Sequence, residues 1–226
     1  MIQSAKKKIV LYQPKQVDDS LGVQSSKDML PLELLTIAAF PLQDGYDVRS
    51  VDGSLFSGTE GHERFAQEAE GAMMVATTAI LGYMVTDSWL AMQAVKKKHP
   101  KVPAVIGGWF ASVRPDLMLE TGLYEAVVIG QGELIFRDLV RAIDAGEPLD
   151  DMEGIAILRD RQVIKNPRRS VAGWDDIPGV PWHLLAPTPY RERQLRATSA
   201  GVRQISGKAA TRISDAALIS SPVAKS

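Results

Sequence analysis

The sequence predicts an α/β fold in which helices cover both faces of a parallel β-sheet. Short apolar runs alternate with helical patterns five times between Lys8 and about Ala145, which is typical of βαβ units. Residues 72–76 are apolar throughout, as a strand buried on both faces requires. These patterns predict a doubly wound sheet of five parallel strands, flavodoxin-like or Rossmann-like, in the order 2-1-3-4-5, followed by a C-terminal β-hairpin and strap.

Each strand of this sheet is followed by a turn or a helix signal. The expected strands are residues 9–12, 47–51, 72–76, 104–106 and 126–129. The expected helices begin at Pro31, near Phe65, at Thr86, Asp87 or Ser88, at Pro115 and before Ile135. We expect the sheet to be complete where Gly146 ends the last of these helices.

Three regions are therefore expected along the chain. Residues 1–150 are predicted to form a ligand-binding domain, and residues 151–188 a hairpin and a linker strap. Beyond Tyr190 the composition shifts to Ser, Ala, Arg and Lys, with little apolar bulk to bury. Such a composition predicts that residues 189–226 form a disordered tail.

Composition narrows the classes of partner. The 26 Lys and Arg residues oppose 27 Asp and Glu residues, so no basic excess favours nucleic acid or an anionic membrane surface. The N-terminus lacks the apolar core and the cleavage site of a signal peptide, and we expect a cytoplasmic protein. The absence of cysteine excludes disulfides, thiolate zinc sites, thiol nucleophiles and Cys-ligated iron–sulfur clusters within this sequence.

The candidate binding residues follow the carboxyl ends of the expected strands, because ligands of doubly wound sheets bind there. After three neighbouring strands these residues are small, glycine-rich or hydroxylated, which favours a groove for a large ligand. They are Gln13, Pro14, Asp52, Thr77, Thr78, Gly82, Gly107, Gly108, Trp109, Phe110, Ser112, Gly130, Gln131, Gly132 and Glu133. No catalytic residue and no protein ligand to a metal ion is assigned.

Several of these residues also have a purely structural interpretation. Asp52 suits a turn, and Glu133 suits the first turn of a helix, where the helix dipole favours negative charge. Thr77 and Thr78 are β-branched residues that favour strand ends in any case. Trp109 and Phe110 also suit a role as aromatic residues that pack in the core rather than line a site.

Three common uses of this fold are not supported. A phospho-receiver needs acidic residues where the chain has Gln13 and Thr77. A dinucleotide fold needs a Gly-rich fingerprint after the first strand, whereas Gly130-Gln131-Gly132 follows the fifth and has Ile135 in place of the third glycine. A P-loop is absent from the sequence. The sequence therefore favours a ligand that is recognised by shape.

A set of motifs recurs in a fixed order along the chain, at residues 31–39, 45–48, 107–112, 130–133, 154–155, 174–178 and 181–185. Together they resemble the N-terminal cobalamin-binding domain of cobalamin-dependent radical S-adenosylmethionine enzymes, a family that includes methyltransferases and the anaerobic cyclase of bacteriochlorophyll synthesis. The resemblance covers about residues 8–188. One departure is Phe110-Ala111, which stands where relatives often have His-Pro.

This resemblance implies cobalamin as the cofactor, with the corrin on the strand ends and the nucleotide tail between the loops after the third and fourth strands. Gly107 and Gly108 would leave room for the benzimidazole, and Thr77 or Thr78 would hydrogen-bond the tail. The chain has no His before His62, so no protein imidazole is expected on the cobalt.

The family's radical barrel begins with a C-x-x-x-C-x-x-C loop, which this sequence lacks. We therefore expect no catalysis by the chain alone. The expected alternatives are a truncated or frameshifted gene product and a stand-alone cobalamin carrier that acts with a separate radical S-adenosylmethionine catalytic chain. Two other readings stay open, namely a flavodoxin-like enzyme with a different cofactor and a degenerate module for protein contacts.

Overall fold

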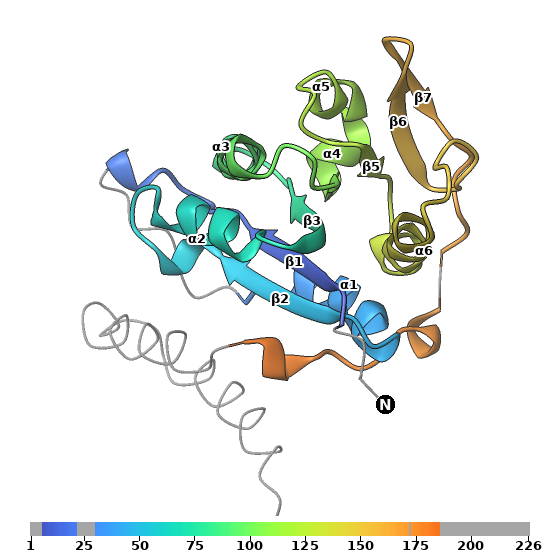
Figure 1. The fold of residues 1–226 in the computed structure, drawn as a ribbon, viewed down its shortest axis with the longest axis horizontal. Helices are drawn as coiled ribbons and strands as arrows, with labels where there is room; N and C mark the ends of the chain where they lie inside the picture. Colours follow the sequence, from blue (N-terminus) through green and yellow to red (C-terminus); the bar gives the residue numbers. More distant parts are fainter. Residues whose placement is uncertain (1–5, 22–29, 172, 186–226) are drawn as a thin grey trace, which may run out of the picture. The chain divides into compact units, whose positions relative to one another are not determined.

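A seven-stranded sheet with helices on both faces forms the frame of the computed structural model (Figure 1). The structure describes residues 6–21, 30–171 and 173–185. The strands are β1 Lys8–Gln13, β2 Asp47–Asp52, β3 Ala72–Thr78, β4 Ala104–Gly107, β5 Ala126–Val128, β6 Ile155–Arg159 and β7 Gln162–Lys165. The helices are α1 Leu32–Gln43, α2 Glu60–Glu68, α3 Tyr83–Lys98, α4 Trp109–Val113, α5 Pro115–Leu119 and α6 Gly132–Ala145, with 3-10 turns η1 Asp19–Leu21, η2 Gly53–Leu55, η3 Trp174–Asp176 and η4 Trp182–Leu184.

The strand order is β2-β1-β3-β4-β5-β6-β7, and the first five strands run parallel in the predicted order. The expectation that the sheet is complete after α6 is wrong. The hairpin β6–β7 pairs antiparallel with β5, through Val127 opposite Ala156 and Val128 opposite Ile155. A hairpin that places apolar residues on both faces can continue a buried edge, which the sequence pattern alone did not show.

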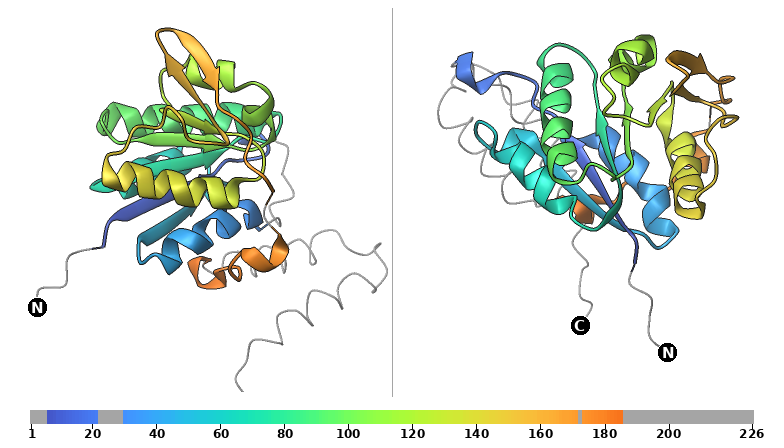
Figure 2. Two further views of the ribbon diagram at one scale, coloured as in Figure 1. Left: turned by 90° about the vertical axis from the view of Figure 1, so that its right-hand side faces the viewer. Right: turned by 45° about the horizontal axis from the view of Figure 1, so that its top comes forward.

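Helices cover the sheet in two layers (Figures 1 and 2). On one face α1 and α6 pack against Ile9, Leu11 and Val105, and on the other face α2, α3, α4 and α5 pack against Val10 and Ile106. The alternation of neighbouring residues between the two faces follows from the period of two in a β-strand. Both faces of the parallel strands therefore pack into hydrophobic cores.

The predicted start of α3 is wrong. The helix begins at Tyr83, after Gly82 with φ of +56°, so the proposed caps Asp87 and Ser88 lie inside it, and both are fully buried. Their polar side chains are also typical of helix N-termini, which explains the misassignment. Buried in the helix, they must find hydrogen-bond partners within the core.

Asp87 is the centre of a buried polar network beneath the carboxyl ends of β1 and β3. Its Oδ2 accepts hydrogen bonds from the Tyr12 hydroxyl and the Lys15 backbone N–H, both at 2.8 Å, and its Oδ1 lies 2.8 Å from His62 Nε2. Burial and the nearby charge of Asp87 raise the pKa of Tyr12, so the hydroxyl keeps the proton that it donates. The network joins β1, α2 and α3.

The predicted strap is described only in part. Residues 174–185 contain η3 and η4, joined by irregular chain. Residues 186–188 of the strap and the predicted tail, residues 189–226, lie outside the described residues. No helix among the described residues is both long and apolar enough to span a bilayer.

We predict that Asp87→Ala lowers the free energy of unfolding by about 2–4 kcal/mol, because it leaves the Tyr12 hydroxyl, the Lys15 N–H and His62 buried without their acceptor. Urea denaturation followed by circular dichroism measures the change. Asp116→Ala, at the surface, is the control and should leave the unfolding midpoint nearly unchanged. Equal midpoints for the two variants would refute the structural role of the network.

Candidate cofactor-binding cleft

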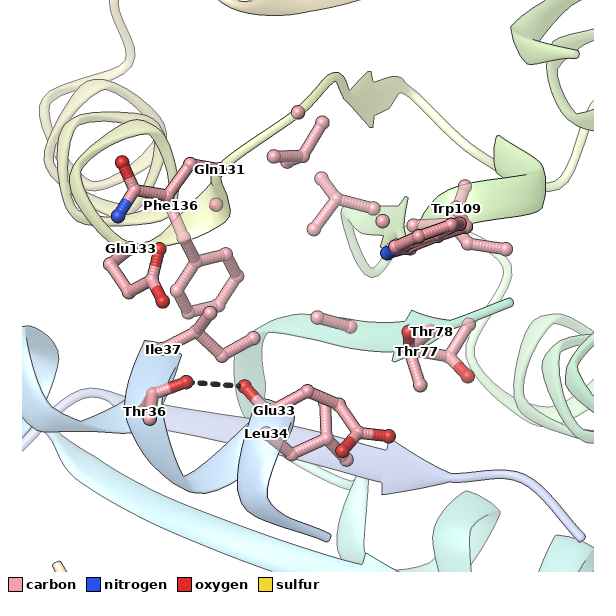
Figure 3. A pocket seen from close by; sticks show the side chains of 18 residues that line it. Glu33, Leu34, Thr36, Ile37, Thr77, Thr78, Trp109, Gln131, Glu133 and Phe136 are labelled. Carbon is pink, nitrogen blue, oxygen red and sulfur yellow. Dashed lines mark hydrogen bonds between the residues drawn. The ribbon is translucent and has the colours of Figure 1, made fainter. Parts of the chain in front are cut away.

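A cleft of about 260 Å³ opens at the carboxyl edge of the parallel strands, on the face covered by α1 and α6 (Figure 3). Its walls come from the start of α1, the ends of β3, β4 and β5, and the start of α6. The lining residues are Glu33, Leu34, Thr36, Ile37, Ala76, Thr77, Thr78, Val105, Ile106, Gly107, Gly108, Trp109, Val128, Gly130, Gln131, Gly132, Glu133 and Phe136. Its deep part is apolar, and its polar side chains come mainly from the two helices and the ends of β3.

Two contacts hold α1 and α6 together beyond the cleft. The Arg137 guanidinium lies over the Phe40 ring, 5.3 Å from its centroid. Arg141 binds Asp44 in a bidentate pair, with both N–H···O distances 2.8 Å. Since these contacts involve residues that follow the cleft-lining residues along α1 and α6, they help set the spacing of the two helices beside the cleft.

The floor of the cleft depends on a close backbone contact between the loops after β3 and β4. The Ala79 N–H donates to the Gly107 oxygen at 2.9 Å, and the Phe110 N–H donates to the Ala79 oxygen at 3.0 Å. Gly108 has φ of +97°, and a Cβ there would lie 2.5 Å from the Ala79 oxygen and 2.7 Å from Thr78 Oγ1. Only glycine fits at this position.

Gly107 has a different role from Gly108. A Cβ at Gly107 would have a single neighbour within 4 Å, the Val128 Cβ at 3.6 Å, which is ordinary contact. Gly107 also lines the cleft. The absence of a side chain at Gly107 therefore keeps space open, whereas at Gly108 it permits the chain to pack.

Two carboxylates give the rim of the cleft its charge. Glu33, on α1, accepts a hydrogen bond from Gln13 Nε2 at 3.0 Å, and Gln13 is 7% exposed. Glu133, on the first turn of α6, has a buried Oε2 without a hydrogen-bond partner among the described residues. Among the residues that line the cleft, no Lys or Arg balances these two charges. The helix dipole of α6 stabilises the carboxylate on its first turn.

The structure brings nine of the predicted site residues into the cleft. They are Thr77, Thr78, Gly107, Gly108, Trp109, Gly130, Gln131, Gly132 and Glu133. Thr77 donates its hydroxyl proton to the Tyr12 carbonyl at 3.2 Å, whereas Thr78 Oγ1 makes no hydrogen bond within the described part of the chain. Trp109 is 79% exposed at the rim.

The other six predicted residues lie outside the cleft lining. Gln13 donates a hydrogen bond from its side-chain amide to the Glu33 carboxylate, and the next residue, Pro14, is buried. The Asp52 side chain accepts from the Ser54 N–H, as expected for a turn. Gly82 precedes α3, and Phe110 packs into the core of the opposite face.

Ser112, the sixth of these residues, ties α4 to the loop after β5. Its hydroxyl accepts from the Gly130 N–H at 3.1 Å and lies 3.4 Å from the Val128 oxygen. It supports the cleft without lining it. The short helix α4 itself was not predicted, because the sequence analysis treated its residues as a loop.

Sequence reasoning missed the contribution of α1. Glu33, Leu34, Thr36 and Ile37 line one wall, and Figure 3 shows them facing the side chains from α6 across the cleft. The predicted strand order contained the necessary signal. The connection from β1 to β2 and the helix after β5 lie on the same face of such a sheet, so their starts meet at the same edge.

A family model described as the B12 binding domain matches residues 20–140, which is more than half of the chain. The chain belongs to this family. It is 28% identical over 163 residues to the uncharacterized methyltransferase PH0819 of Pyrococcus horikoshii, covering 71% of this chain and 35% of that protein. It is 24% identical over 170 residues to the anaerobic magnesium-protoporphyrin IX monomethyl ester cyclase of Synechocystis sp., covering 74% and 34%. The chain spans about a third of the length of these curated relatives.

Solved structures of cobalamin-dependent radical enzymes share the fold. TsrM from Kitasatospora setae, a radical S-adenosylmethionine methyltransferase solved with cobalamin and a 4Fe-4S cluster, has a TM-score of 0.60 at 18% identity, covering 77% of this chain and 31% of that one. OxsB, solved with aqua-cobalamin and S-adenosylmethionine, has a TM-score of 0.67 at 12% identity, covering 84% and 26%. The Rossmann-like fold that the sequence predicted is thus shared with both.

The two adjacent glycines give a matched pair of substitutions. Gly108→Ala should lower the free energy of unfolding by about 2 kcal/mol or more, because its Cβ meets backbone and its φ is unfavourable. Gly107→Ala should change it by less than about 1 kcal/mol. Urea denaturation of both variants tests the distinction, and similar losses at the two positions would contradict it.

Proposed function

We propose that this chain binds cobalamin by inserting the nucleotide tail into the cleft, with the corrin lying over the carboxyl edge of the sheet. The observation that carries this proposal is the open space in front of Gly107. Small-molecule sites typically measure about 300–1,000 Å³, so a cleft of about 260 Å³ suits a part of a large ligand better than the whole of it. A tailed corrinoid matches that requirement.

The lining residues fit such a tail. Apolar side chains from Val105, Val128 and Phe136 suit the face of a benzimidazole ring. The free hydroxyl of Thr78 is the better placed of the two threonines to bond the tail, because the Thr77 hydroxyl already bonds backbone. Trp109, exposed at the rim, suits the apolar surface of a ligand that extends beyond the cleft.

A phosphate-anchored cofactor, such as a flavin nucleotide, has less support from the same residues. Binding a phosphate monoester ordinarily uses a loop of backbone N–H groups after the first strand, or an Arg or Lys in the site. The charged side chains that line the cleft are Glu33 and Glu133. The nucleotide tail of cobalamin also contains a phosphodiester, so the cleft favours insertion of its uncharged benzimidazole, with that phosphate kept away from the two carboxylates.

We include in the proposal that cobalt takes no imidazole from this chain. His62 is hydrogen-bonded to Asp87 on the opposite face of the sheet, and His99 Nε2 lies 2.9 Å from the Ala66 oxygen. His183 lies in η4, and none of the three is among the residues that line the cleft. Burial and neighbouring groups would then tune the metal.

The proposed role is that of a binding module. Cobalamin supplies the reactive chemistry when bound, and the residues of this chain bind and orient it. A Cys-ligated cluster would have to come from residues outside this sequence, which contains no cysteine. We therefore propose that the module acts together with a separate radical S-adenosylmethionine catalytic chain or domain.

The test is a titration of the full chain with hydroxocobalamin, followed by the corrin absorbance retained after gel filtration and by calorimetry. We expect Gly107→Leu to raise the dissociation constant at least about tenfold, because the leucine side chain would fill the cleft. No binding to the unsubstituted chain at tens of micromolar ligand would refute the proposal.

Gly179→Leu is the matched control, since a Cβ at Gly179 would meet nothing within 4 Å and the residue does not line the cleft. It should bind hydroxocobalamin like the unsubstituted chain. Unfolding midpoints of both leucine variants separate a blocked cleft from a damaged fold. Equal affinity of Gly107→Leu and Gly179→Leu would place the ligand elsewhere.

A further inference from the structure

The most unusual polar group in the cleft is the carboxylate of Glu133. Its Oε2 is buried and has no hydrogen-bond partner among the described residues. Buried polar atoms in folded proteins are almost always hydrogen-bonded, because an unpaired acceptor loses its hydration without compensation. Figure 3 shows the side chain extending from α6 toward α1, at the border of the cleft.

Among the described residues, no neighbouring side chain supplies the missing donor. Across the cleft, the Thr36 hydroxyl donates to the Glu33 backbone oxygen at 3.0 Å. One N–H of the Gln13 amide donates to the Glu33 carboxylate, and no N–H of this amide bonds Glu133 Oε2 in the described part of the chain. The carboxylate of Glu33 is itself an acceptor and repels a second carboxylate. Among the described residues, the donor for Glu133 Oε2 is therefore left to a bound ligand.

We infer that Glu133 is a specificity residue of the cleft, whose Oε2 accepts a hydrogen bond from an uncharged N–H or O–H group of the bound corrinoid. This inference rests on the proposed function. Cobalamin carries two kinds of such donor, the amide N–H groups of the corrin side chains and the ribose hydroxyls of the nucleotide tail. A charged acceptor in a partly dry site forms a stronger hydrogen bond than a neutral one, and it rejects ligands that lack the donor.

Glu133→Met tests the inference, because methionine keeps the length of the side chain and removes the acceptor. We expect the dissociation constant for hydroxocobalamin to rise about tenfold or more. Glu133→Gln should cost only about threefold, because the amide can turn its oxygen toward the same donor. Glu147→Met, on an exposed residue just beyond α6, is the matched control and should bind like the unsubstituted chain.

A structural role for Glu133 would give a different result. The unliganded Glu133→Met variant should keep its unfolding midpoint, because the lost interaction with the helix dipole is offset by removal of an unpaired buried oxygen. A structural role predicts instead a lower midpoint and rescue of binding at low temperature. That outcome would overturn the inference.

Cobinamide, which lacks the nucleotide, distinguishes the two sources of the donor. If Glu133→Met weakens cobalamin and spares cobinamide, the donor is a ribose hydroxyl. If both ligands weaken equally, the donor is a corrin amide, and either result supports the inference. Unchanged binding of both ligands to Glu133→Met overturns it.

Binding by the unsubstituted chain distinguishes a failure of the proposed function from a failure of this inference. Should the unsubstituted chain bind neither cobalamin nor cobinamide, the cleft is no corrinoid site, and the inference falls with the function. Should the unsubstituted chain bind cobalamin and Glu133→Met bind it equally well, the function stands and only the role of Glu133 is refuted.

Discussion

The cleft depends on the contact between the loops that leave β3 and β4. Two backbone hydrogen bonds join Ala79 to Gly107 and Phe110, and the positive φ of Gly108 lets the two segments approach this closely. A side chain at Gly108 would push the loop away from β3, and the floor of the cleft would lose its shape. The open space at Gly107 therefore depends on the backbone packing of the adjacent Gly108 against Ala79.

The two faces of the sheet contribute to this edge in different ways. Beneath the face covered by α2 and α3, the Asp87 network satisfies every polar group that it buries and joins β1 to α3. Ser88 adds a link, since its hydroxyl donates to the Thr78 oxygen at 2.6 Å or the Met84 oxygen at 2.8 Å. The face covered by α1 and α6 instead keeps a cavity and a carboxylate oxygen, Glu133 Oε2, that has no hydrogen-bond partner in the described part of the chain. The buried hydrogen bonds of the Asp87 network thus stabilise the sheet whose other face carries the cavity.

The fold could be predicted from the sequence largely because its signals are local. Continuous apolar runs and their spacing gave the five parallel strands and their order, and the family match agrees with the motifs in the 107–112 and 130–133 loops. The attachment of β6 to β5 was missed, since strand pairing depends on an edge that no local pattern describes. The start of α3 is misplaced for a different reason: Asp87 and Ser88 have side chains typical of helix N-termini, and their burial inside the helix depends on tertiary packing.

The cleft could be predicted less completely than the fold. Strand ends pointed to Thr78, Gly107 and the 130–133 loop, which the structure brings together. The sequence could not separate Gly107 from Gly108, because both are glycines in one turn and only the distances to Ala79 and Val128 tell them apart. Nor could it show that Glu133 Oε2 has no hydrogen-bond partner among the described residues, since that depends on what α1 presents across the cleft.

The residues that line the cleft and the hairpin that covers the edge of the sheet come from different segments of the chain. All of its lining residues lie between Glu33 and Phe136, inside the segment that matches the B12 binding domain. The hairpin β6–β7 lies at the opposite end of the strand order from β2 and contributes nothing to the lining. It covers the edge of β5, which would otherwise expose unpaired backbone groups. Lining the cleft and covering the sheet edge are thus tasks of different strands, yet they are coupled, because β6 pairs through Ile155 with Val128, which lines the cleft.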